Sequence, residues 1–156
     1  MTVPELVELG TEDILLDCDF DYNENEKYQL DIKWYFNGEP SPFFQWVPGQ
    51  MSKPQIIGER FRDLVDIDHS VHTDSYKSHR ALLLKKPSLE LSGVYTCKVS
   101  TFLDEDIRRK RMIIYCKFKF ESTLLMMVDR FVSSTSTTIV RVPIPLKSTE
   151  FTSKKD

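Results

Sequence analysis

Alternating apolar and polar residues recur in short segments along the chain as far as Tyr115, and turn residues separate these segments. Alternation is the pattern of a half-buried β-strand, because successive side chains of a strand point to opposite faces of a sheet. In residues 13–20 the apolar side chains fall on one face, namely Ile14, Leu16, Cys18 and Phe20. No long segment with helical spacing competes with the strands. Many short strands joined by turns predict an all-β sandwich.

The expected strands cover the segments 3–9, 13–20, 30–36, 43–47, 64–68, 79–84, 93–100 and 108–115. Asn37-Gly38, after the third of them, is a strong turn signal. Alternation places two apolar sets on the inner faces of their strands: Ile32, Trp34 and Phe36 in one strand, and Tyr95, Cys97 and Val99 in another. We expect both sets to face the core.

The composition changes after Tyr115, and the end of the chain mixes Ser, Thr and Lys with prolines. The run Ser133–Thr138 has low complexity and is typical of a flexible stalk or linker. We therefore predict one folded domain over residues 1–118 and a flexible C-terminal tail over 119–156, largely disordered from Ser122 onward. An added strand near Thr138–Val142 is the alternative for part of that tail.

Cys18, Trp34 and Cys97 stand in the order and approximate spacing of an immunoglobulin domain. In that fold the two cysteines lie on different sheets and their disulfide joins the sheets, while the tryptophan packs against the bridge. The resemblance therefore implies a Cys18–Cys97 disulfide. Closing a loop of this length would stabilise the fold by roughly 4 kcal/mol in the chain-entropy model.

The run Leu91–Cys97 resembles the immunoglobulin signature Asp-x-Gly-x-Tyr-x-Cys, with Tyr95 at the position of the tyrosine corner. It departs from the signature at Leu91, where an acidic residue usually stands, and this removes the usual ion pair but not the corner. The long span from Trp34 to Cys97 leaves room for extra edge strands. These features predict an immunoglobulin-like β-sandwich of the V type.

Within the immunoglobulin superfamily, three segments resemble the first domain of the insect beaten-path proteins: Ile32–Tyr35, Phe43–Pro48 and Leu89–Cys97. The resemblance covers residues 3–115. It implies a secreted or membrane-anchored neuronal recognition protein, active in cell adhesion and axon guidance, that binds sidestep-type immunoglobulin receptors. Met1–Leu6 lacks the basic start and apolar run of a secretory signal. Removal of such a signal is one explanation, and an intracellular structural immunoglobulin domain with reduced cysteines is the alternative.

Other function classes find little support in the residues. The net charge of −3 gives no basic field for nucleic acid, and no apolar run approaches the roughly 20 residues that span a bilayer. A nucleophile elbow of the Gly-x-Ser-x-Gly type is missing, so we expect no enzyme and no cofactor. Asp66–Asp74 and His79 have the side-chain types of zinc ligands, but their spacing matches no ligand pattern, and we expect a solvated loop without metal.

The candidate binding residues follow from alternation. Trp34, Tyr95 and Cys97 face the core, so their neighbours face outward. Phe44 and Trp46 are expected on the same outer surface, where aromatic residues are favoured interface anchors, and Phe43 is left open between core and surface. The predicted partner-binding residues are Lys33, Tyr35, Phe44, Trp46, Thr96, Lys98 and Ser100.

Two further features of the sequence have more than one interpretation. Arg108–Arg111 follows Asp104–Asp106 and is expected at the solvated tip of the last hairpin, with heparin-like polyanions or acidic lipids as alternative ligands. Cys116 is the third cysteine, and both an interchain disulfide and an unmodified thiol stay open for it.

Overall fold

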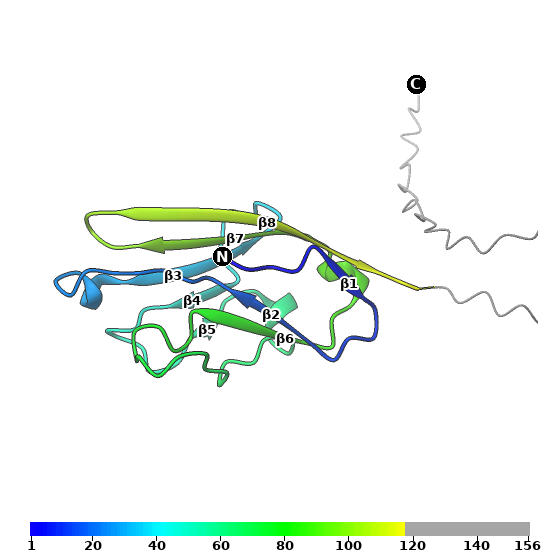
Figure 1. The fold of residues 1–156 in the computed structure, drawn as a ribbon, viewed down its shortest axis with the longest axis horizontal. Coiled ribbons are helices and arrows are strands. Elements are labelled where there is room, and N and C mark those ends of the chain that lie inside the picture. The colour runs from blue at the N-terminus through cyan, green and yellow to red at the C-terminus, as the bar shows by residue number, and fades with distance from the viewer. Residues whose placement is uncertain (118–156) are drawn as a thin grey trace, which may run out of the picture. The chain divides into compact units, whose positions relative to one another are not determined.

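Residues 1–117 are the part of the chain that the computed structural model describes (Figure 1). They form two β-sheets and three short 3-10 helices. The tail predicted over 119–156 and the alternative strand near Thr138–Val142 lie outside the described residues.

The larger sheet has six strands in the order β1-β8-β7-β3-β4-β5, and the smaller sheet pairs β2 with β6 (Figure 1). Among the strand pairs within residues 1–117, only that of β1 with β8 is parallel. The strand bounds are β1 Leu6–Glu8, β2 Asp13–Asp17, β3 Asp31–Phe36, β4 Phe44–Trp46, β5 Gln55–Ile56, β6 Ala81–Lys85, β7 Gly93–Ser100 and β8 Glu105–Tyr115. The 3-10 helices are η1 Lys27–Gln29, η2 Glu59–Phe61 and η3 Leu89–Leu91.

The start of the chain changes sheets. Thr2 forms an antiparallel bridge with Asp17 at the end of β2, and its N–H donates to the Asp17 carbonyl at 2.6 Å. After Pro4 the chain crosses to the larger sheet, where β1 pairs with residues 113–115 of β8. In Figure 1, β1 accordingly lies beside the C-terminal part of β8.

Most expected strands are present, with differences at the edges. β7 has the predicted bounds, while β8 begins at Glu105, earlier than expected. The segment expected as a strand over 64–68 forms only an isolated bridge, between Val65 and Leu84. β5 was not predicted, because two residues are too few to display an alternating pattern.

The core lies between the sheets, and the predicted inward sets are confirmed: Ile14, Leu16, Cys18, Phe20, Ile32, Trp34, Phe36, Tyr95, Cys97 and Val99 are all buried. Cys18 and Cys97 are bonded, with their Cα atoms 6.3 Å apart. Trp34 is the residue directly opposite Cys97 on the neighbouring strand, so its indole shares the inner face with the bridge. The disulfide therefore joins the two sheets, and Trp34 lies on the same inner face, as the resemblance implied.

The tyrosine corner is present as well. Tyr95 is fully buried, and its hydroxyl donates a hydrogen bond of 2.8 Å to the carbonyl oxygen of Leu91. Burial raises the pKa of this phenol, because the phenolate would lose its hydration. Leu91 is buried in the core, which accounts for the apolar residue at a position that is usually acidic.

The Asn37-Gly38 turn has the conformation that its sequence predicts. Both residues have positive φ, 51° and 75°, which asparagine and glycine tolerate best. The side-chain oxygen of Asn37 also accepts the N–H of Val94 at 2.8 Å. A Cβ atom at Gly93 would lie only 2.4 Å from that oxygen, so the glycine of the signature leaves room for this contact.

The prediction that Phe44 and Trp46 lie on the outer surface is wrong. Phe44 pairs directly with Trp34, and Trp46 with Ile32. Directly opposite residues share a face, so both rings point into the core, where each is 1% exposed. Phe43, the residue left open, is buried too and stacks on Phe61 with 3.9 Å between ring centroids.

The prediction that Arg108–Arg111 forms the hairpin tip is also wrong. These residues lie within β8, where Arg108 pairs with Cys97 and Arg111 with Val94. The turn between β7 and β8 comes earlier and ends before Glu105. The acidic residues therefore stand nearest the tip, and the basic residues follow along the strand.

Candidate protein-binding surface

The outer face of the larger sheet carries rows of side chains that cross β3, β7 and β8. Tyr35 pairs with Thr96 and Thr96 with Arg109, while Lys33 pairs with Lys98 and Lys98 with Ile107. Gln45 lies opposite Lys33 on β4. Over the rows that start from Asp31, Lys33 and Tyr35, the side chains on this face are Asp31, Lys33, Tyr35, Gln45, Thr96, Lys98, Ser100, Glu105, Ile107 and Arg109. We call this set the outer face.

Five of the predicted binding residues lie together there: Lys33, Tyr35, Thr96, Lys98 and Ser100. Their role in binding stays a prediction. Thr96 is only 8% exposed, so it offers little area to a partner. Sequence reasoning missed Gln45 and the residues of β8, because their faces follow from strand pairing and not from alternation alone.

The Asp31 carboxylate organises the polar side chains next to it. One oxygen forms an ion pair with Lys33, and the other accepts a hydrogen bond of 2.9 Å from the Gln45 amide. Gln55 Nε2 donates in turn to Gln45 Oε1 at 3.5 Å. The two opposite charges on β3 are thus held in place by hydrogen bonds that continue to β4 and β5.

A second ion pair joins Lys98 on β7 to Glu105 on β8. The hydrogen bond that Lys98 donates to the Glu105 carboxylate raises the pKa of Lys98, because it favours the charged ammonium. Exposed pairs of this kind contribute little to stability. Their effect here is to fix where the charges stand.

The tip of the β7–β8 hairpin presents apolar side chains to solvent. Phe102 is 86% exposed and Leu103 is 78% exposed. Phe102 also borders a shallow groove whose other walls include Tyr28 and Gln45. The apolar tip therefore adjoins the outer face.

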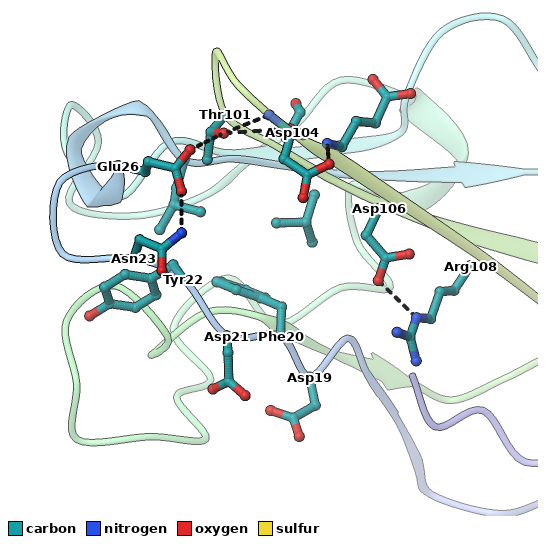
Figure 2. A pocket seen from close by; sticks show the side chains of 14 residues that line it. Asp19, Phe20, Asp21, Tyr22, Asn23, Glu26, Thr101, Asp104, Asp106 and Arg108 are labelled. Carbon is teal, nitrogen blue, oxygen red and sulfur yellow. Dashed lines mark hydrogen bonds and ion pairs between the residues drawn. The ribbon is translucent and has the colours of Figure 1, made fainter.

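Hydrogen bonds hold this tip in place (Figure 2). The hydroxyl of Thr101 accepts the N–H groups of Leu103 and Asp104, each at 3.2 Å, and lies 3.2 Å from Glu26 Oε1, to which it donates. Glu26 is buried, and its second oxygen accepts from Asn23 Nδ2 at 2.9 Å. The buried carboxylate thus ties the hairpin to the loop between β2 and β3.

A pocket beside the tip has many acidic side chains in its wall (Figure 2): Asp19, Asp21, Glu26, Asp104, Glu105 and Asp106. Several of them have basic partners. Asp19 pairs with Arg80, Asp21 with Lys77 and Asp106 with Arg108. The bond from Lys77 lowers the pKa of Asp21. These pairs offset much of the negative charge of the pocket wall.

The histidine segment has structural contacts. His79 Nδ1 lies 2.8 Å from the carbonyl oxygen of His69, and its ring packs perpendicular to that of Trp46 with centroids 5.3 Å apart. Within residues 1–117, no three side chains of His, Cys, Asp or Glu converge in a way that could hold a metal ion. The same residues contain no helix with the length and apolar character needed to cross a membrane.

Comparison with known proteins identifies the fold. No family model matches the chain, and no curated protein does. The human B7-H4 IgV-like domain is similar in structure, with a TM-score of 0.50 and 19% identity over 74% of this chain and 94% of that chain. An amphioxus IgVJ-C2 molecule matches with a TM-score of 0.47 and 16% identity, over 70% of this chain and 54% of that chain.

The fold is an immunoglobulin-like β-sandwich of the V type, as the sequence predicted. The sheet order, the inter-sheet disulfide and the tyrosine corner agree with the likeness to a V-like domain. The beaten-path resemblance, which concerns a narrower family, stays a prediction.

Proposed function

We propose that this domain is an extracellular or cell-surface recognition module that binds another immunoglobulin-type receptor through the outer face and the β7–β8 tip. The observation that carries the proposal is the exposure of Phe102 and Leu103 on a tip held by the Thr101 and Glu26 hydrogen bonds. A loop whose backbone is already held in place loses less conformational entropy on binding than a free loop does. Aromatic side chains are also enriched among the residues that dominate binding energy.

The outer face next to the tip has the composition of an interface rim. Tyr35 is half-buried among charged groups of both signs, with Lys33 paired to Asp31 and Lys98 to Glu105. A surface of this kind suits a partner that also presents both signs, as a protein does. It is poorly suited to a polyanion.

The position of the basic run argues further against a polyanion. Alternation along β8 turns Arg109 and Arg111 to the outer side and Arg108 and Lys110 to the opposite side. The four charges are thus split between two faces. Arg108 is moreover paired with Asp106.

The disulfide supports a location outside the cytosol, because structural disulfides persist in oxidising compartments. In the alternative, an intracellular structural domain, Cys18 and Cys97 would be reduced. Thiol titration of the protein isolated from its own cells, with free thiols blocked during lysis, separates the two. Two additional reactive thiols after unfolding would favour the intracellular domain.

The binding test is surface plasmon resonance against a panel of extracellular immunoglobulin-type receptors, with sidestep-type proteins first because of the beaten-path resemblance. We expect Phe102→Ser and Tyr35→Ala each to weaken binding by about thirtyfold, which corresponds to about 2 kcal/mol. Leu15→Ser is the matched control, since Leu15 is an exposed apolar residue on the smaller sheet.

Trp46→Ala is not a suitable binding test, because the buried ring belongs to the core. Full binding by both Phe102→Ser and Tyr35→Ala would contradict the proposed surface. Loss of binding in Leu15→Ser alone would place the site on the smaller sheet.

A further inference from the structure

Strand β8 has an edge that is unpaired over most of its length within residues 1–117. β7 pairs with residues 105–112 along one edge. Along the other edge, β1 pairs only with residues 113–115. Figure 1 shows the hairpin half of β8 extending beyond β1. The open edge therefore runs from Glu105 to Arg111.

The backbone groups that face this edge follow from the neighbouring hydrogen bonds. Ile113 N–H donates to Glu5, and Tyr115 C=O accepts from Leu9, so these residues direct their backbone groups away from β7. Backbone groups alternate in direction along a strand. The N–H and C=O groups of Ile107 and Arg109 therefore also point away from β7, toward the open edge. There they are free to form hydrogen bonds with a further strand.

The order of charges along the open edge is such that a second copy, running in the opposite direction, would place its basic residues opposite the acidic ones of the first. Glu105 and Asp106 precede Ile107, and Arg108 and Arg109 follow it. We propose that a second copy of this chain pairs antiparallel with this edge, on a two-fold axis at Ile107. Glu105 then lies opposite Arg109 of the second copy, and Asp106 opposite Arg108 of the second copy. The inference goes beyond the proposed function and does not rest on it.

Strand geometry and charge select this register. If the register shifted by one residue, backbone groups that point to the open edge in one copy would lie opposite groups that point toward β7 in the other. The hydrogen bonds between the two strands would then be lost. A shift that centres the axis on Arg108 would place that residue opposite its own copy, and like charges directly opposite are destabilising. Centring on Ile107 avoids both and brings together two side chains that are each 44% exposed.

The ion pairs within one copy leave carboxylate oxygens available for ion pairs between copies. Glu105 bonds Lys98 through Oε2 and Asp106 bonds Arg108 through Oδ2, so each carboxylate keeps a second oxygen. Charged residues on an edge strand often prevent pairing with other chains. In this edge their order favours one partner, a second copy in antiparallel orientation.

The experiment is sedimentation equilibrium of the full chain from about 5 μM to about 500 μM, because an interface of one strand edge is small and such associations are weak. We expect the wild type to approach a dimer at the upper end. Arg109→Glu and Glu105→Arg should each weaken dimerisation by about tenfold or more, since each places like charges opposite one another. An equimolar mixture of the two variants should regain wild-type association as a heterodimer, because their charges are again complementary.

Arg111→Glu is the matched control, since Arg111 lies directly opposite no charged residue of the second copy in this register. Its reversal should weaken the association clearly less than Arg109→Glu does, because its distance to Glu105 of the second copy is the longer, diagonal one. Amide hydrogen exchange, measured at both ends of the concentration range, gives a second readout. Ile107 and Arg109 should become protected only at high concentration.

A wild type that stays monomeric at the highest concentration overturns the proposal. So does a dimer that persists in both Arg109→Glu and Glu105→Arg, because it would use another surface. Protection of Ile107 and Arg109 in a monomer at all concentrations also overturns it, since another segment of the same chain would then occupy the edge.

Discussion

The two faces of strand β3 show how differently neighbouring residues of this chain behave. Ile32, Trp34 and Phe36 are almost completely buried, whereas Asp31, Lys33 and Tyr35 stay partly exposed. The inner set packs in a core that also holds the disulfide and the tyrosine corner. The outer set carries charge of both signs and adjoins the apolar tip. Stability therefore depends chiefly on one face, and recognition is proposed for the other.

The largest difference in stability is expected between substitutions of two adjacent residues of β4, Trp46 and Gln45. Trp46→Ala should lower the free energy of unfolding by about 3–5 kcal/mol, because it removes a large buried ring and leaves a cavity. It would also remove the hydrogen bond from the indole N–H to the carbonyl oxygen of Met51. Chemical denaturation monitored by circular dichroism measures the change.

Gln45→Ala is the companion variant on the outer face and should cost only about 0.5–1.5 kcal/mol, the usual net contribution of a hydrogen bond such as the one that Gln45 donates to Asp31. Equal effects of Trp46→Ala and Gln45→Ala would contradict the assignment of β4 side chains to their faces.

A smaller difference is expected between two tyrosine hydroxyls. Tyr95→Phe should destabilise the fold by about 1–3 kcal/mol, because it leaves the buried carbonyl oxygen of Leu91 without its donor. Tyr35→Phe should be close to neutral, since water replaces any bond of an outer-face hydroxyl. Thermal and chemical melts of both variants test this, and a larger loss in Tyr35→Phe would refute it.

The smallest effect concerns alkaline pH. Burial raises the pKa of Tyr95, so the folded state holds this proton more tightly than the unfolded chain does. The resulting stabilisation is complete below the unfolded pKa of about 10 and is lost as pH rises toward the folded value. Between about pH 9 and pH 11, the wild type should lose about 1 kcal/mol more stability than Tyr95→Phe.

Lys98→Met supplies the outer-face counterpart for that titration. The pKa of Lys98 is also raised, by its bond to Glu105, but the pair is exposed to water. The stability of Lys98→Met should therefore fall with rising pH in the same way as that of the wild type. Parallel curves for the wild type and Tyr95→Phe would show that Tyr95 is not the group responsible.

The sequence by itself determined the sandwich and the inner faces of its long strands. Residues 13–20, 30–36 and 93–100 alternate clearly, and a period of two fixes which side chains share a face. The order of Cys18, Trp34 and Cys97, with Tyr95 before the second cysteine, then identified how the two sheets are joined. The outward positions of Lys33, Tyr35 and Lys98 followed from the same alternation.

Only the tertiary structure decided which way β4 faces and where the last hairpin turns. Residues 43–46 contain three aromatic rings around Gln45, and such a run does not reveal its inner face. The face is set by pairing with β3, where Phe44 lies opposite Trp34. Likewise, the Thr101 hydrogen bonds close the hairpin before Glu105 and place the basic run inside β8. Both outcomes depend on strand register, which arises from contacts between segments distant in the sequence.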